Sequence, residues 1–237
     1  MTADDKILDA LFTALFPHRC AYCGKVISSE KRCCDECADS LPRITGEICR
    51  KCGREKKVCS CKKSEKYFDG LAAPFYFMGE VRKGIHAYKF RRWRSNAEAF
   101  GYEMAKTVNE RFGSVVFDYI IAVPLTEKSR RERGYNQCEL LAEELSKHLN
   151  LEHRKGVLLK IYETRKQHTI SSVFRKGNLS GVFEVNNPSE VEGKTVLLVD
   201  DISTTGETFN ECSKMLWLYG AKSVYCISTA LTLKKGK

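Results

Sequence analysis

Eight cysteines near the N-terminus are arranged as four close pairs. In chain order, the pairs are Cys20 with Cys23, Cys34 with Cys37, Cys49 with Cys52, and Cys59 with Cys61. A spacer of two residues lets two thiolates turn onto one ion, and two such pairs complete the tetrahedron of a structural Zn²⁺, at about 2.3 Å from the metal. We therefore predict two zinc sites, the first held by Cys20, Cys23, Cys34 and Cys37 and the second by Cys49, Cys52, Cys59 and Cys61.

Two other interpretations of these cysteines are oxidised pairs and a ligand exchange in which Cys33 replaces a neighbouring cysteine. The last pair, in addition, has a spacer of only one residue. Four successive pairs in a segment with few large apolar residues favour metal, because such a segment needs zinc to supply folding energy. The acidic opening Thr2–Asp5 is unlike a signal peptide, so we expect a cytoplasmic protein, in which disulfides are rare.

A second motif combines acidic, hydroxyl and glycine residues after an apolar run. The run Thr195–Val199 is followed by Asp200, Asp201 and the segment 202–208 (ISTTGET). In open α/β sheets, ligands bind beyond the carboxyl ends of the strands. Adjacent carboxylates there can accept hydrogen bonds from sugar hydroxyls, and N–H groups at a helix N-terminus can hold a phosphate. The pattern favours a phosphosugar site over the simpler alternative of an ordinary capped helix.

The elements that would position these residues alternate between strands and helices. Apolar runs predict strands at 71–78, 117–123, 157–161, 195–199 and 223–229. Helical spacing of apolar residues predicts helices at 7–16, 96–112, 136–149 and 208–219. Ser95 and Glu98 have the spacing of a capping box, and Gly220 lies where a C-terminal cap belongs. This alternation predicts an α/β fold with an open, mostly parallel sheet and helices on both faces.

Length and composition also indicate a folded protein. The chain has 237 residues, of which 43% are hydrophobic, and a formal net charge of +10. These values exclude a largely disordered chain, and no apolar run approaches the roughly 20 residues of a membrane helix. We expect two domains divided at a charged linker, namely 1–66, with the N-terminal helix and the zinc module, and 67–237, with the α/β fold.

The segment 196–208, VLLVDDISTTGET, resembles the phosphoribosyl pyrophosphate (PRPP) signature of type I phosphoribosyltransferases. Further stretches narrow the resemblance to the ComF family, which is associated with natural competence. These stretches are Ala122–Leu125, Arg133–Gln137, and a block with Thr164, Gln167, Arg175, Asn178 and 181–183. The cysteine-rich segment is similar to the double zinc ribbon of that family. The resemblance spans most of the chain and implies a type I phosphoribosyltransferase fold after an N-terminal double zinc ribbon.

The resemblance implies roles for individual residues. Asp200 and Asp201 would hold the ribose hydroxyls, and with Arg133 they would form the catalytic set. The 5′-phosphate would lie on Ser203, Thr204, Thr205, Gly206, Glu207 and Thr208. The pyrophosphate would lie near Val123, Pro124 and Leu125, with Mg²⁺ and Arg133 neutralising its charge. The mobile loop that covers the site in this fold would include Arg165, Gln167 and Arg175.

Two functions follow from this resemblance. The first is a phosphoribosyltransferase that binds PRPP with Mg²⁺ and has an unidentified acceptor; Thr204, where 6-oxopurine enzymes carry an aspartate, argues against hypoxanthine or guanine. The second is a non-catalytic accessory protein of DNA uptake, which binds single-stranded DNA, contacts proteins of the competence machinery and uses the PRPP site for sensing. The basic stretches 128–133 and 160–176 would flank pyrophosphate. The stretch 82–94 has six cations and no acid, and it is the basic stretch that remains available to bind DNA.

Overall fold

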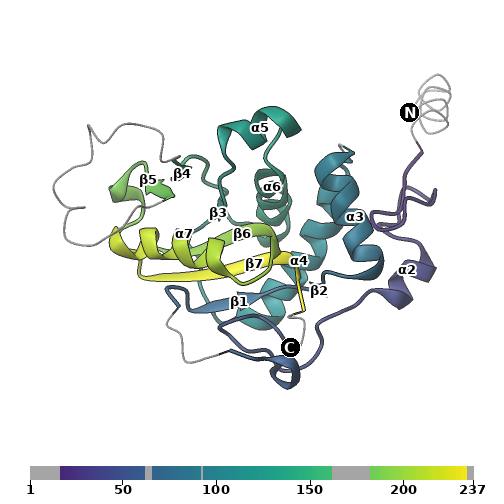
Figure 1. Cartoon of the computed structure of the whole chain (residues 1–237), viewed down its shortest axis with the longest axis horizontal. Helices are drawn as coiled ribbons and strands as arrows, with labels where there is room; N and C mark the ends of the chain where they lie inside the picture. The colour runs from purple at the N-terminus through teal and green to yellow at the C-terminus, as the bar shows by residue number, and fades with distance from the viewer. Residues whose placement is uncertain (1–16, 62–65, 92, 162–181, 234–237) are drawn as a thin grey trace.

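The computed structural model describes residues 17–61, 66–91, 93–161 and 182–233 (Figure 1). The predicted helix at 7–16 lies outside these residues, as do Arg165, Gln167 and Arg175 of the predicted mobile loop. Within the described ranges, no helix is long and apolar enough to cross a membrane.

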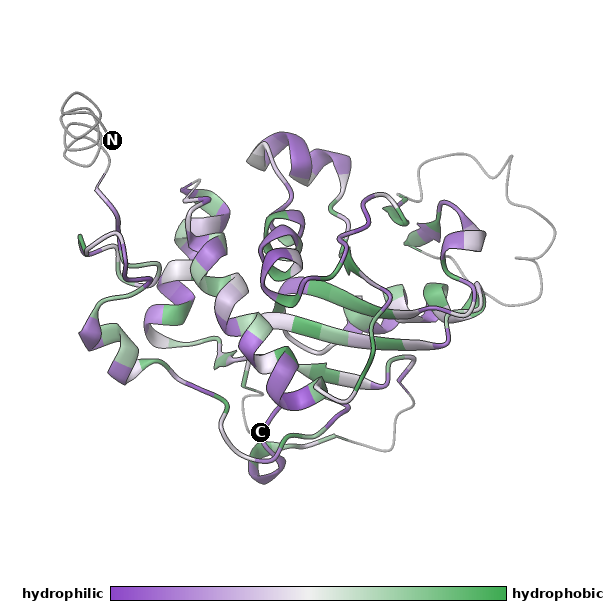
Figure 2. Cartoon of the chain, turned by 180° about the vertical axis from the view of Figure 1, so that it is seen from behind, coloured by the Kyte–Doolittle hydropathy of each residue, from purple (hydrophilic) through white to green (hydrophobic). Residues whose placement is uncertain are grey.

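A parallel sheet forms the centre of the molecule. Its strands are β1 (Gly70–Ala72), β2 (Phe75–Tyr76), β3 (Tyr119–Ala122), β6 (Thr195–Ser203) and β7 (Ser223–Leu231). They pair in the order β1-β7-β6-β3, and β2 pairs with β7 beyond β1. Strands that are covered on both faces consist of nearly continuous apolar residues, and Figure 2 shows these strands as the hydrophobic interior of the fold. The predicted parallel α/β sheet is therefore confirmed.

Helices cover both faces of this sheet (Figures 1 and 2). The longer ones are α3 (Gly79–Phe90), α4 (Asn96–Phe112), α6 (Gln137–Leu149) and α7 (Glu207–Leu218). The short ones are α2 (Asp35–Ser40), α5 (Glu127–Arg133) and the 3₁₀ turns η1 (Lys56–Val58) and η3 (Pro188–Glu190). Helices α4 and α6 contact each other on one face of the sheet, and α7 lies on the other. Gly220 follows α7 with a φ of +85°, as a C-terminal glycine cap requires.

Predicted features that differ in the structure include two strands and one helix cap. The strand predicted at 71–78 is divided into β1 and β2 around Pro74, which has no N–H for a ladder. The strand predicted at 157–161 is β4 (Leu158–Lys160), which pairs antiparallel with β5 (Phe183–Val185) outside the main sheet. Its Leu159 is 42% exposed, as expected for a strand with one solvent-exposed face. The Ser95 side chain makes no capping hydrogen bond.

The sequence did not predict α3, because its interior glycine weakens the helical signal. Gly84 is nonetheless required there, because a Cβ at this position would lie 2.4 Å from the carbonyl oxygen of Ala21 in the first ribbon. The Asn96 side chain closes the same contact by donating to Ala21 O at 2.9 Å. Tyr22 packs edge-on against Phe100, with ring centroids 5.7 Å apart. The buried residues of the ribbons and of the sheet form one hydrophobic cluster, and the domain boundary at 66/67 stays a prediction.

Candidate functional site

The acid pair lies at the point where β6 passes the end of β3. Ala122 of β3 pairs with Val199, and the N–H of Val123 donates to Val199 O at 2.8 Å. The predicted pyrophosphate segment and the acid pair therefore lie side by side. The strand does not end at 199 as predicted, because β7 runs beside it and continues the ladder to Ser203.

Asp200 is held by two hydrogen bonds. Its Oδ1 accepts from the Cys138 thiol at 3.3 Å and from the backbone N–H of Asp201 at 2.8 Å. Burial, followed by repulsion from Asp201, raises the pKa of Asp200 from its usual value of 3.8 to about 7, although both hydrogen bonds oppose this shift. A ligand that brings hydroxyl donors or a cation would favour the charged form.

Asp201 is buried and already has a cationic partner. Its Oδ1 lies 2.8 Å from Nζ of Lys89, which extends from α3, and Asp201 itself is 6% exposed. The sequence did not predict a role for Lys89 at this site, because Lys89 lies in the basic stretch 82–94, which is expected to be available to DNA. A signal was present, since Lys89 directly follows Tyr88, which shares the buried face of α3 with Val81 and Ile85.

The N-terminus of α6 joins the end of β3 to the acid pair. Asn136 caps this helix by accepting from the N–H of Cys138 at 2.9 Å, and its Nδ2 donates to Val123 O at 3.2 Å. The Tyr135 hydroxyl donates to the carbonyl oxygen of Tyr88. The stretch 133–137 thus contributes scaffold contacts. Arg133 is the last residue of α5; its side chain lies outside the described part of the structure, and its catalytic role stays a prediction.

The predicted phosphate loop connects β6 to α7. Ser203 is buried, Thr204, Thr205, Glu207 and Thr208 are exposed, and Gly206 turns the chain with a φ of +80°. Within the described part of the chain, no protein acceptor takes the N–H groups of Thr204, Thr205 or Gly206. Unsatisfied N–H groups before a helix fit an anion such as phosphate.

The remaining predicted contacts surround this loop only in part. Val123 is buried, while Pro124 and Leu125 are half-buried beyond β3. The ends of the block that contains the predicted mobile loop meet, because the N–H of Ile161 donates to Val182 O at 2.8 Å. The residues of that block itself, 162–181, lie outside the described ranges.

Two four-cysteine clusters have the geometry of zinc sites. They are the predicted sets, Cys20, Cys23, Cys34 and Cys37, and Cys49, Cys52, Cys59 and Cys61, and the sulfurs of each set lie within 4.8 Å of one another. The Cys23–Cys34 and Cys52–Cys59 sulfur pairs are both 3.7 Å apart. Sulfurs at tetrahedral corners around zinc are about 3.8 Å apart, whereas a disulfide needs about 2.05 Å. Cys33 is not a member of the first cluster, so the predicted ligand sets fit a double zinc ribbon.

A third cluster joins Cys138 to the acid pair, again within 4.8 Å. Its carboxylates are the hard oxygen ligands that Mg²⁺ prefers, whereas a thiol is not. The cluster therefore fits Mg²⁺ only through Asp200 and Asp201, with the remaining positions left to substrate oxygens and water.

Comparisons with known proteins agree with this geometry. A family model described as "Double zinc ribbon domain" matches residues 11–67, and one described as "Phosphoribosyl transferase domain" matches residues 136–237. The chain is 29% identical over 217 residues to DNA utilization protein YhgH of Shigella flexneri, covering 90% of each protein. It is 27% identical over 219 residues to Competence protein F of Haemophilus influenzae, covering 88% of this chain and 95% of that protein.

Among solved structures, glutamine PRPP amidotransferase from B. subtilis complexed with ADP and GMP is similar to part of the fold. The TM-score is 0.41 with 20% sequence identity, and the similarity covers 57% of this chain and 26% of that chain.

Proposed function

Because this chain belongs to the ComF family and carries a double zinc ribbon and a phosphoribosyltransferase domain, we propose that it binds PRPP with Mg²⁺ and transfers the phosphoribosyl group to an acceptor. One observation carries the proposal. The acid pair of β6, of which Asp201 is buried, is followed directly by a loop in which the N–H groups of Thr204, Thr205 and Gly206 have no protein acceptor among the described residues. A ribose 5-phosphate presents hydroxyls and a phosphate to match these two features.

Each part of the site would act on one part of PRPP. Asp200 and Asp201 would accept hydrogen bonds from the ribose hydroxyls, and the N–H groups of Thr205 and Gly206 would hold the 5′-phosphate. In the transfer, a nucleophilic atom of the acceptor would form a bond to C1 of the ribose as the bond between C1 and the pyrophosphate oxygen breaks, so negative charge would grow on the leaving pyrophosphate beside Val123. Mg²⁺, when bound, would neutralise part of that charge. The cysteines of the two clusters would hold zinc as a structural ion.

Transfer is tested by release of pyrophosphate. Protein mixed with Mg²⁺, PRPP and a panel of bases and other nucleophiles should release pyrophosphate above the acceptor-free background, and Asp201→Asn should reduce this release at least 100-fold, because a ground-state and transition-state contact is lost. A coupled phosphate assay measures the rate. Release at the background rate across a broad panel would leave PRPP binding as the function and would argue against transfer.

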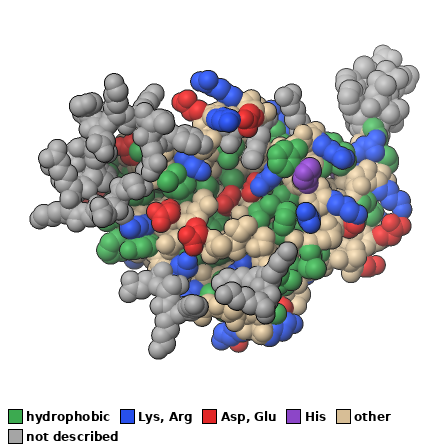
Figure 3. All heavy atoms as spheres, in the orientation of Figure 1, with side chains coloured by type: hydrophobic (Ala, Val, Ile, Leu, Met, Phe, Trp, Pro, Cys, Tyr) green, Lys and Arg blue, Asp and Glu red, His purple; other side chains and the backbone are tan. Residues whose placement is uncertain are grey.

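A second function, binding of single-stranded DNA, is favoured by the exposed face of α3. Arg82, His86 and Phe90 follow one another at intervals of four residues, and all three are exposed. The rings of His86 and Phe90 lie 4.7 Å apart, and Phe90 is 60% exposed. Lys and Arg side chains gather with hydrophobic ones over α3 (Figure 3). Aromatic rings that stack on bases, bordered by cations for the phosphates, are typical of single-strand binding surfaces.

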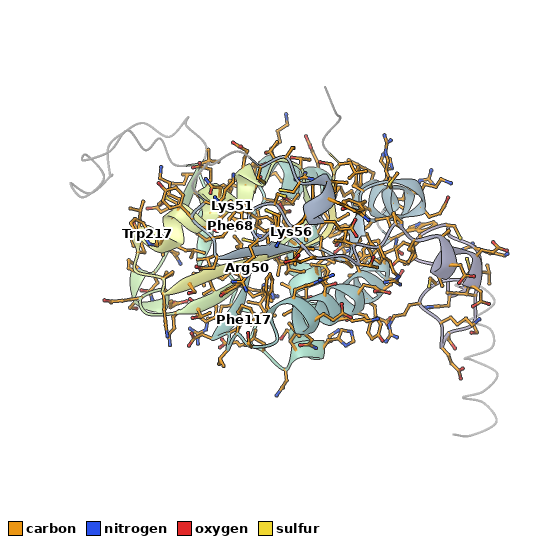
Figure 4. The ribbon with its side chains drawn as sticks, turned by 90° about the horizontal axis from the view of Figure 1, so that it is seen from below. Arg50, Lys51, Lys56, Phe68, Phe117 and Trp217 are labelled. Carbon is orange, nitrogen blue, oxygen red and sulfur yellow. The ribbon has the colours of Figure 1, made fainter. Side chains whose placement is uncertain are left out.

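Replacing Phe90 by alanine should therefore weaken binding of an oligothymidine about 5- to 150-fold, since stacking of one base contributes roughly 1–3 kcal/mol. Fluorescence anisotropy at several salt concentrations measures this effect, and affinity should fall as salt rises. Trp217→Ala is the matched control, because Trp217 is 59% exposed on α7, away from α3 (Figure 4). Equal losses in both variants, or affinity that is unchanged by salt, would contradict this function.

A further inference from the structure

A buried arginine of the second ribbon contacts the predicted phosphate loop. Arg54 is 3% exposed. Its Nη2 donates to the carbonyl oxygen of Thr204 at 2.6 Å, and its Nε donates to that of Thr232 at 2.7 Å. Thr204 is the first residue after β6, and Thr232 is the first residue after β7. One guanidinium thus ties the ends of two neighbouring strands to the ribbon.

The position of Arg54 depends on the turn that carries the zinc ligands. The N–H of Cys49 donates to Arg54 O at 2.8 Å, and that of Gly53 donates to Cys49 O at 2.7 Å. Gly53 has a φ of +70°, and a Cβ there would lie 2.8 Å from Leu231 Cδ1 and 2.9 Å from Leu71 O. The turn is therefore pressed against β1 and β7, below the sheet in Figure 1. A ribbon that lost its metal would lose the turn that directs Arg54 inward.

The hydrogen bond to Thr204 fixes the direction of the next N–H group. In a planar trans peptide, the carbonyl and the following N–H point in opposite directions. Because the Thr204 carbonyl points toward Arg54, the N–H of Thr205 points away from the ribbon, and it has no protein acceptor within the described ranges. A phosphate that binds this N–H would therefore lie on the side of the loop away from the ribbon.

The charge of Arg54 is also suited to an anion. Among the described residues it forms no ion pair, although a buried cation without a counter-charge is unfavourable. Its hydrogen bond to Thr204 polarises the peptide group at the start of the loop. A phosphate that accepts from the N–H of Thr205 would add a negative charge on the far side of the Thr204–Thr205 peptide.

We propose that Arg54 is a positioning residue that couples the second zinc ribbon to the phosphate loop, so that the metal-bound ribbon keeps the loop ready for PRPP. This inference rests on the proposed function, because it assumes that the loop holds the 5′-phosphate. Coupling between two sites is reciprocal. PRPP should therefore also slow the loss of zinc from the second ribbon.

Hydrogen exchange of the ligand-free protein tests the contact independently of PRPP. In Arg54→Met, which has no donor, peptides covering 199–209 should exchange about 10- to 100-fold faster, the range expected for lost hydrogen bonds to a charged group. PRPP affinity measured by calorimetry should fall by a similar factor, with two zinc ions retained per chain. Arg50→Met is the matched control, because Arg50 is an exposed cation of the same ribbon (Figure 4).

Arg54→Lys is the second test variant, to be used if Arg54→Met fails to fold or loses zinc. Its single ammonium can reach only one of the two carbonyls, so both exchange and affinity should be intermediate. In the wild type, PRPP should slow chelator-driven release of one zinc, and in Arg54→Lys this protection should be weaker. Wild-type exchange at 199–209 in the Arg54 variants would overturn the coupling. If the Arg54 variants exchange faster but the wild type binds no PRPP, the contact of Arg54 with the loop is supported and the proposed function is refuted.

Discussion

Cys52→Ser is expected to bind one zinc ion per chain where the wild type binds two. Its sulfur lies 3.7 Å from that of Cys59 in the second cluster, so the substitution removes one corner of a tetrahedral site. Zinc contributes about 10–16 kcal/mol of binding free energy to small zinc modules, and the second ribbon should unfold without it. Native mass spectrometry measures the metal content, and limited proteolysis within 45–61 measures the unfolding.

Cys33→Ser is the matched control for this prediction. Cys33 is next to Cys34 in the sequence, but it is not a member of the first cluster. This variant should keep both zinc ions and its resistance to protease. Loss of a zinc ion from Cys33→Ser, or two ions retained by Cys52→Ser, would show that the ligand sets are assigned wrongly.

Asp200→Asn is expected to make the protein more stable at pH 8 while it removes affinity for PRPP. The pKa of Asp200 is raised from 3.8 to about 7, so between these values the folded state holds a proton that the unfolded state releases. Stability therefore falls as pH rises through this window and stays reduced above it. Asparagine has no such charge, and its Oδ1 still accepts from the Cys138 thiol and the Asp201 N–H.

The expected gain is on the order of 1–3 kcal/mol at pH 8, which corresponds to a rise in melting temperature of roughly 2–12 °C for a chain of this size. The gain should disappear near pH 4. Calorimetric melting at both pH values measures it. Asp118→Asn is the control, and it should lower the stability at pH 8 rather than raise it. The N–H of Thr195, and then Lys194, lower the pKa of Asp118. An Asp200→Asn variant less stable than the wild type at pH 8 would contradict this account of the pair.

The sequence predicted the helices and strands that have long apolar patterns. The helix at 96–112 matches α4, and the apolar run from Thr195 leads into the acid pair as expected. The sequence did not predict α3, because its register depends on a tertiary contact of Gly84 with Ala21 that no local pattern encodes. It also could not assign β4 to a separate sheet, since its partner β5 follows a gap of more than twenty residues.

The site was predictable only where one segment contains it. The acid pair and the phosphate loop follow each other directly in the sequence, and the cysteine pairs all lie within one segment, 20–61. Lys89 and Arg54 come from distant segments and face the site only after folding. The charge pattern assigns Lys89, with the rest of the stretch 82–94, to DNA, and nothing in the sequence singles out Arg54, because a sequence does not show which cations the fold directs inward.

Calorimetric titration with PRPP and Mg²⁺ tests the central claim most directly, by comparing the wild type with Asp200→Asn/Asp201→Asn. Asp118→Asn is included as a control, since Asp118 precedes β3 at the end of the sheet away from the loop. We expect saturable binding of one PRPP by the wild type and by Asp118→Asn, and no measurable binding by the double variant. Absence of binding to the wild type, or equal binding by the double variant, would contradict the assignment of the acid pair of β6 to PRPP.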